Sequence, residues 1–195
     1  MREAGTAMWA RQHLGGQDEH DDATVRAFRE LTDLEAIRAL KARYFRYLDT
    51  KQWERLRAVF VDDLETDGFW AKGRDADEFV ASLAENLKAV RSVHLGSMPE
   101  ISILGPEDAQ GIWAMSDYLE WEPDASRYRG RGAPGQRGVR GYGHYEESYR
   151  RGANGWQISF MRLTRLRIDP IFEIPGPDPG DWLPSGASDW LEGDK

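Results

Sequence analysis

The chain has 195 residues, 40% of them hydrophobic, and a formal net charge of -8. This length is enough for one domain with a sizeable core. The negative charge is unfavourable for binding a phosphate backbone, and the absence of cysteine excludes disulfides, a thiol nucleophile and zinc held through sulfur. No apolar run approaches the roughly 20 residues that cross a bilayer, and the N-terminus lacks the apolar core of a signal peptide. We therefore expect a cytoplasmic protein that binds neither nucleic acid nor a membrane.

The N-terminal part of the chain predicts a tail and three helices. Residues 1–30 are polar and weakly patterned, so we expect them to be flexible. One helix is expected to begin near Asp33, a second to run from about Trp53 to its end at Asp62-Asp63, and a third to span about residues 75–90. Their apolar residues recur at helical spacing: Leu34, Ile37, Leu40, Tyr44, Tyr47 and Leu48, then Trp53, Leu56, Val59 and Phe60, then Phe79, Leu83 and Leu87.

The chain then becomes strand-like. A short strand is expected at residues 65–71, and four long strands are expected at 92–104, 109–121, 141–151 and 156–168. Turn signals and a Gly/Arg-rich loop at 123–140 connect the long strands as hairpins. This order favours the α+β class: a cone-shaped, strongly curved, mainly antiparallel sheet whose three N-terminal helices enclose a pocket.

These elements place one domain at residues 31–169, between two tails. Residues 170–195 are rich in proline and glycine and should be irregular. Trp182 and Trp190 in this second tail are expected to dock on the domain or on a neighbouring subunit.

Ionisable residues on apolar strand faces are the first candidates for a site, because burying an unpaired charge costs several kcal/mol. Asp117 alternates with Trp113 and Met115. It either has a function in the interior, pairs structurally with an arginine, or faces water at a bulge. Arg162 alternates with Phe160 and is predicted to point inward, where it could pair with Asp117. Arg165 is predicted on the solvated face.

Histidines and tyrosines supply further candidates. His94 lies on one predicted strand, and His144 shares a strand face with Tyr142. A lone strand histidine is usually structural, although its near-neutral pKa would suit acid/base work. Tyr44 and Tyr47 lie on the buried stripe of the first helix, where they either pack or donate a hydrogen bond to a substrate oxygen.

Asp49 has two interpretations. The pattern Asp49-x-x-Gln52 resembles a capping box for the second helix, worth about 1 kcal/mol. Thr50 could cap instead, which would free the Asp49 carboxylate. Tyr44 and Asp49 do not share a helical face, so they would converge only if the helix unwinds near Asp49.

Four segments together resemble the SnoaL-like family of the nuclear transport factor 2-like superfamily. They are LTDLEAIRALKARYFRYLDTKQWERLRAVFVDD, VHLGSMPEISILGPEDAQGIWAMSDYLEW, GYGHYEESYRR and GWQISFMRLTRLRID, within residues 31–169. Within this superfamily the polar residues look most similar to the branch of scytalone dehydratase and bile-acid 7α-dehydratase. The resemblance implies a cone fold, a small-molecule pocket and no cofactor or metal.

The resemblance also implies catalytic and substrate-binding residues. The matching catalytic candidates are Tyr44, Asp49, His94, Asp117 and His144. Arg162 loosely matches an arginine near the pocket of bile-acid 7α-dehydratase, and we expect it to bind substrate together with Tyr47, Trp113, Tyr142 and Phe160. The resemblance implies a mechanism that forms an enolate. His94, held by Asp117 or Asp49, removes a proton from the carbon next to a carbonyl, and a tyrosine donates a hydrogen bond to the enolate oxygen.

The predicted function is therefore a cofactor-independent dehydratase, isomerase or cyclase acting on a hydrophobic carbonyl compound such as a polyketide or steroid. The alternative is a non-catalytic binding or scaffolding member, its cone filled by aromatic side chains. A third alternative is binding of RNA or another anion by the Gly/Arg loop. Family resemblance also implies a homodimer or homotrimer through the outer sheet face, to which we assign Tyr145, Tyr149 and Met161.

Overall fold

The computed structural model describes residues 3–69, 71, 73–121 and 133–173, with side chains from Asp22 onward. The helices are α1 (Glu3–Asp49), α2 (Trp53–Arg57) and α3 (Ala76–Leu87). The strands are β1 (Phe60–Asp67), β2 (Val90–Ile103), β3 (Asp108–Trp121), β4 (Gly138–Gly152) and β5 (Gly155–Ile171). None of the described helices is both long and apolar enough to cross a membrane.

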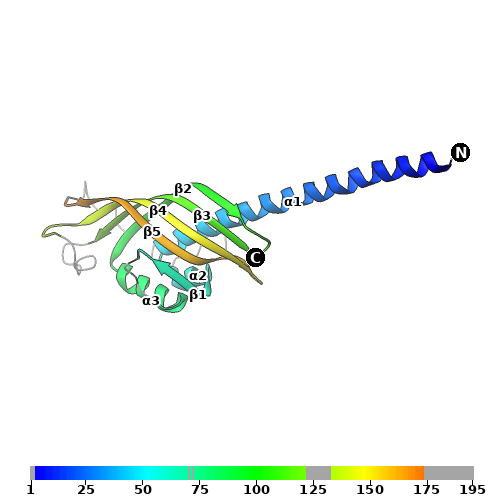
Figure 1. Ribbon diagram of the computed structural model, residues 1–195. Coiled ribbons are helices and arrows are strands. Elements are labelled where there is room, and N and C mark those ends of the chain that lie inside the picture. The colour runs from blue at the N-terminus through cyan, green and yellow to red at the C-terminus, as the bar shows by residue number, and fades with distance from the viewer. Residues whose placement is uncertain (1–2, 70, 72, 122–132, 174–195) are drawn as a thin grey trace.

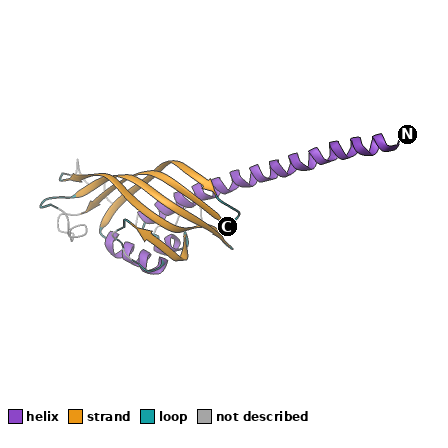
Figure 2. Cartoon of the chain, viewed as in Figure 1, coloured by secondary structure: helices purple, strands orange, loops and turns teal. Residues whose placement is uncertain are grey.

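The strands form one curved, unclosed sheet in the order β1-β5-β4-β3-β2. β1 is parallel to β5, and every other neighbouring pair is antiparallel. The C-terminal part of α1 crosses the sheet, with α2 and α3 beside it, whereas the N-terminal part projects away from the domain (Figures 1 and 2). The predicted α+β class and curved sheet packed on N-terminal helices are confirmed.

The first helix is longer than expected, because α1 begins at Glu3 and not near Asp33. The segment 3–49 contains no proline and is rich in strong helix formers, so nothing ends the helix before Asp49. The prediction relied on an apolar stripe, which a helix needs only where it packs. The division of the chain into a domain and two tails remains a prediction.

The second helix is shorter than expected. It ends at Arg57, and Phe60 opens β1, which the sequence predicted only from residue 65. The backbone N–H of Ile158 donates to the carbonyl of Val59, so the chain is already hydrogen-bonded to β5 one residue before β1 begins. The β-branched and aromatic residues of this segment favour a strand.

Two extra residues in β5 decide which side chains face the core. Ser159 has no partner between the pairs Phe160–Ser148 and Ile158–Tyr149, and Leu166 has none between Arg165 and Arg167. Because side chains alternate with a period of two, one extra residue reverses the faces beyond it. Trp156 and Ile158 therefore share the core face with Met161, Leu163 and Arg165. The prediction that Arg162 points inward is wrong.

β3 follows its predicted alternation along its whole length. Gly111, Trp113, Met115, Asp117, Leu119 and Trp121 are buried, whereas the residues between them are not. On β4 the buried face carries Tyr145, Glu147 and Tyr149. Tyr145 and Tyr149 are each 1% exposed and Met161 is 0% exposed, so the assignment of these three residues to the outer face is wrong.

A buried polar chain lies in this core. Lys41 forms an ion pair with Glu147, and the side chains of both are almost inaccessible, at 1% and 0%. Tyr149 donates to Glu147 at 2.6 Å and accepts from Trp113 Nε1 at 2.8 Å. The Lys41 ammonium also lies 3.7 Å from the ring centroid of Tyr145. These contacts compensate the buried charges of Lys41 and Glu147.

Candidate active site

The Asp49 carboxylate binds His94 through both of its oxygens. Oδ1 lies 2.6 Å from His94 Nδ1, and Oδ2 accepts the His94 backbone N–H at 2.7 Å. The predicted capping box is wrong, because Gln52 begins α2 without any side-chain cap. α1 ends at Asp49 and the chain turns at Lys51, which has a φ of 60°. The carboxylate reaches β2 although α1 stays helical through Asp49, so the unwinding expected near Asp49 is not observed.

The Asp49 contact fixes the role of each imidazole nitrogen. A carboxylate beside Nδ1 favours the tautomer in which Nδ1 carries the hydrogen. Nε2 is then the ring nitrogen without a hydrogen, which can accept one. The imidazole also stacks on Phe45, with 6.3 Å between the ring centroids and 9° between the planes, so its orientation is fixed from a second side.

His94 lines a small cavity between the sheet and the helices. The other lining residues are Tyr44, Leu48, Phe69, Leu83, Leu87, Leu119, Tyr145, Leu163 and Arg165. The wall is thus mainly apolar, with two hydroxyls and one guanidinium. The cavity measures about 20 Å³, which is room for one water molecule. A larger ligand fits only if some of these lining side chains move.

The two tyrosines at this cavity are held as hydrogen-bond donors. Burial raises the pKa of Tyr44 well above its usual value, and burial together with the charge of Asp117 raises that of Tyr145. Both hydroxyls therefore keep their hydrogens at neutral pH. Their rings pack edge to face, with 6.0 Å between the ring centroids. The sequence predicted Tyr44 as a donor but assigned Tyr145 to the wrong face.

Asp117 pairs with Arg165, and not with His94 or Arg162. Asp117 lies directly across from His94 in the β2–β3 register, yet its Oδ2 lies 2.6 Å from Arg165 Nη2. The Asp117 side chain is 0% exposed. Of the alternatives for Asp117, the arginine pair is the one observed, with the partner changed because the bulge at Ser159 turns Arg165 inward.

This ion pair lies against a glycine on β4. A Cβ placed on Gly141 would overlap both the Arg165 guanidinium and the Asp117 carboxylate. Replacing Gly141 by alanine should therefore separate a buried pair. We expect this substitution to lower the free energy of unfolding by about 2–5 kcal/mol in a urea titration.

The matched control for this prediction is Gly105→Ala, since a Cβ at Gly105 would meet nothing within 4 Å. The control should change stability by less than about 1 kcal/mol. Equal stability of the two variants would show that the Asp117–Arg165 pair does not depend on the space at Gly141.

Four of the predicted site residues lie away from this cavity. His144, Tyr142, Phe160 and Arg162 are on the outer face of the sheet, where Arg162 pairs with Asp67 and Glu146. We expected their side chains to point inward because alternation separates the two faces of a strand without showing which face packs on the helices. The pairing of β4 with β5 decides that. Tyr47 and Trp113 are buried in the core and do not line the cavity.

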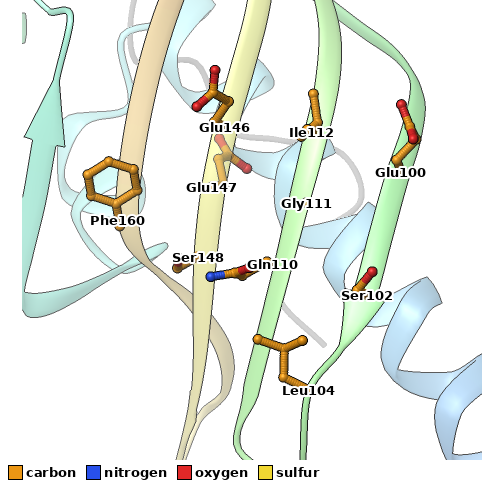
Figure 3. A pocket seen from close by; sticks show the side chains of 10 residues that line it. All are labelled: Glu100, Ser102, Leu104, Gln110, Gly111, Ile112, Glu146, Glu147, Ser148 and Phe160. Carbon is orange, nitrogen blue, oxygen red and sulfur yellow. The ribbon is translucent and has the colours of Figure 1, made fainter.

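A larger groove, of about 460 Å³, lies on that outer face (Figure 3). Phe160 of β5 and Glu146 and Ser148 of β4 face it, together with Gln110 of β3 and Ser102 of β2. It contains no histidine, and Glu146 is occupied by Arg162 and Thr164. The groove is therefore a poorer candidate for acid/base chemistry than the cavity at His94.

Sequence reasoning missed Arg165, Tyr145 and the Lys41–Glu147 pair. The position of Lys41 could have indicated a buried ion pair, since this charged residue lies on the apolar helix stripe between Ile37 and Tyr44. Glu147 likewise alternates with two tyrosines. In the described part of the chain, no three His, Asp or Glu side chains gather as metal ligands would. The Gly/Arg loop, for the most part, and Trp182 and Trp190 lie outside the described residues.

The curved, unclosed mixed sheet packed on N-terminal helices matches the α+β cone fold of nuclear transport factor 2-like proteins. The model of the SnoaL-like domain matches residues 29–162, and the chain belongs to this family.

Related proteins carry several names. "Probable cyclase FGR4" of Gibberella zeae is 24% identical over 145 residues, covering 67% of this chain and 89% of that protein. The structure of a hexachlorocyclohexane dehydrochlorinase, LinA type 2, matches with a TM-score of 0.65 and 17% identity over 79% of this chain and 99% of that one. A Novosphingobium aromaticivorans protein provisionally named a scytalone dehydratase matches with a TM-score of 0.61 and 17% identity, over 82% and 97% of the two chains. At these identities, the two structural matches show the fold alone.

Proposed function

We propose that this protein is a cofactor-independent lyase or isomerase that forms an enolate from a hydrophobic carbonyl compound, such as a polyketide or a steroid. The observation that carries the proposal is the Asp49–His94 pair, which leaves Nε2 as a base beside an apolar cavity with hydroxyl and guanidinium donors. The names of the related cyclase, dehydrochlorinase and dehydratase support a reaction of this general kind.

In the proposed mechanism His94 Nε2 takes a proton from the carbon next to the carbonyl. The electrons of that C–H bond form the enolate, and a donor among Tyr44, Tyr145 and Arg165 stabilises the charge on its oxygen. In a dehydration the enolate then expels hydroxide from the β carbon, and protonated His94 gives it a proton to form water. An isomerisation returns the same proton to another carbon.

The test detects the enolate directly and needs no knowledge of the later step. Hydrophobic ketones, hydroxyketones and enones are incubated with the protein in deuterium oxide, and deuterium incorporation next to the carbonyl is followed by NMR. We expect the wild type to accelerate exchange for at least one compound, and His94→Ala to lose that acceleration. Equal exchange by both proteins for every compound would remove His94 from the chemistry.

A non-catalytic binding or scaffolding role is the second candidate, and the cavity volume of about 20 Å³ favours it. A catalytic cavity of this volume must widen to admit a substrate, and Leu83 and Leu87 of α3 are among the side chains that line it. A ketone that is processed should therefore protect amide hydrogens of α3 from exchange or expose them. A packed scaffold would show neither catalysis nor any response of α3.

We also infer that the chain forms a homodimer or homotrimer through the outer face of the sheet. Leu95 is 61% exposed and Tyr142 is 40% exposed, and both lie across from Ser116 in neighbouring strands. Replacing Leu95 by glutamate should lower the mass measured by light scattering to that of a monomer. Val25→Glu on α1, where Val25 is 47% exposed, should leave the mass unchanged. A wild-type protein that is already monomeric would contradict the inference.

A further inference from the structure

Lys51 occupies a backbone conformation that lysine rarely adopts. Its φ is 60°, and among the described residues only Met98 shares a positive φ without being glycine. Side chains are strained in this region, whereas glycine enters it freely. The turn itself uses backbone groups, since the Lys51 N–H donates to the carbonyl of Leu48 at 3.3 Å. Glycine would suit this turn better, so the lysine side chain needs a separate explanation.

The Lys51 side chain reaches the catalytic pair through one intermediate. Its Nζ donates to Ser92 Oγ at 2.9 Å, and Ser92 Oγ donates to Asp49 Oδ1 at 2.8 Å. Asp49 Oδ1 in turn lies 2.6 Å from His94 Nδ1. Asp49 of α1 is the charged group that acts on the ammonium, and Trp53 of α2 places its ring centroid 5.9 Å from Nζ.

The chemistry of these groups leaves Ser92 one orientation. An ammonium has three donors and no acceptor, so Ser92 Oγ must accept from Lys51 and cannot donate to it. The single hydroxyl hydrogen of Ser92 is then free to point at Asp49. The carboxylate receives that hydrogen and the Nδ1 hydrogen on Oδ1, and the His94 backbone N–H on Oδ2.

We propose that Lys51 is a positioning residue, whose ammonium orients the Ser92 hydroxyl toward Asp49 and thereby keeps the carboxylate aligned on His94. This inference rests on the proposed function, in which Asp49 and His94 act as one acid/base pair.

The proposal has a consequence at alkaline pH. Burial lowers the pKa of Lys51 to about 8, against the opposing effect of Asp49. A neutral amine has a lone pair, so above this pH Ser92 can donate to Lys51 and release Asp49. Activity should then fall as pH rises through about 8.

Stability should move in the opposite direction over the same range. The unfolded chain keeps the Lys51 proton up to about pH 10.5, whereas the folded protein loses it near 8. The unfolded state therefore binds more protons between these values, and the contribution of Lys51 to stability rises with pH. Loss of activity by this route is thus distinguishable from alkaline unfolding.

The experiment compares Lys51→Gly, Lys51→Met and Lys51→Arg with the wild type in two measurements. The first is the downfield proton NMR signal of the Nδ1–H of His94, followed from pH 6.5 to 9.5, which needs no substrate. The second is the pH profile of kcat for any ketone that the wild type exchanges. Arginine stays charged over this range, whereas glycine removes both the charge and the backbone strain.

We expect the wild-type signal to shift or broaden through about pH 8, and the Lys51→Arg signal to stay constant to pH 9.5. Lys51→Gly and Lys51→Met should show the altered signal at every pH and a kcat about 10-fold lower, since outer contacts of a catalytic group typically have effects of this order. Ser92→Ala, which breaks the same link while leaving the turn intact, should abolish the change near pH 8.

A Lys51→Gly protein with the wild-type signal and pH profile would overturn the proposal and reduce Lys51 to a turn residue. If the wild type exchanges no compound, the proposed function fails, yet the NMR signal still decides whether Lys51 orients the pair. If the Lys51 variants do not fold, Ser92→Ala tests the proposal instead. A His94 Nδ1–H signal in Ser92→Ala with the same pH dependence as in the wild type would overturn it.

Discussion

Replacing His94 by glutamine is expected to lower kcat/KM for enolate formation by a factor of about 10²–10⁴, the range that a positioned general base contributes. Glutamine keeps polar atoms near the ring position but cannot take a proton at neutral pH. Asp49→Asn should cause a loss of similar order, because an amide can present an N–H to Nδ1 and favour the wrong tautomer. The measurement is the rate of deuterium exchange at saturating and at low ketone concentration.

His144→Gln is the matched control for this prediction. The same substitution is made on a strand of the same sheet, but His144 lies on the outer face, outside the cavity. Its kcat/KM should stay within about twofold of the wild type, since its side chain points to the face of the sheet opposite the proposed base and donors. A large loss in His144→Gln with little loss in His94→Gln would move the active site to the other face of the sheet.

Replacing Lys41 by methionine is expected to destabilise the folded protein strongly. It leaves the Glu147 carboxylate fully buried without its cation, which typically costs about 3–5 kcal/mol. Tyr149 still donates to Glu147, so the loss should lie toward the lower end. The free energy of unfolding from urea titration at pH 7 measures this change.

A second variant separates the unpaired charge from lost packing. Lys41→Met combined with Glu147→Gln removes both charges and should recover most of the lost stability, because no buried ion remains. Lys88→Met breaks an exposed pair with Glu85, whose side chains are 66% and 73% exposed, and should cost less than about 1 kcal/mol. If the double variant is as unstable as Lys41→Met, the packing of the lysine stem matters more than its charge.

The local pattern was enough to predict most of the elements. β3 alternates as expected from Gly111 to Trp121, and Asp75 caps α3 by accepting the Glu78 N–H at 2.9 Å. These features depend on neighbours in sequence, through the alternation of a strand or the orphan N–H groups of a helix start. The family resemblance rested on sequence segments within these elements, and the match of the SnoaL-like domain model to residues 29–162 confirms it.

For two elements, the prediction from the local sequence pattern was wrong. The start of α1 was predicted from amphipathicity, which reports packing and not helix formation. The inward face of β5 was predicted from unbroken alternation, and the extra residue Ser159 reversed it. A bulge depends on which residue of β4 pairs with which residue of β5, and that choice leaves no mark in β5 itself.

The candidate site divides in the same way. Residue types and spacing alone identified Tyr44, Asp49 and His94 as candidates, and left open whether Asp49 would cap the second helix or reach His94. Tertiary structure decided that α1 ends there and that Asp49 binds His94 through both oxygens. It also decided that Asp117 pairs with Arg165, and that His144 lies outside. The physical reason is that residue type and spacing set the chemistry a side chain can perform, whereas its partner depends on the end of a helix and the register of a sheet, which are fixed only when distant segments pack.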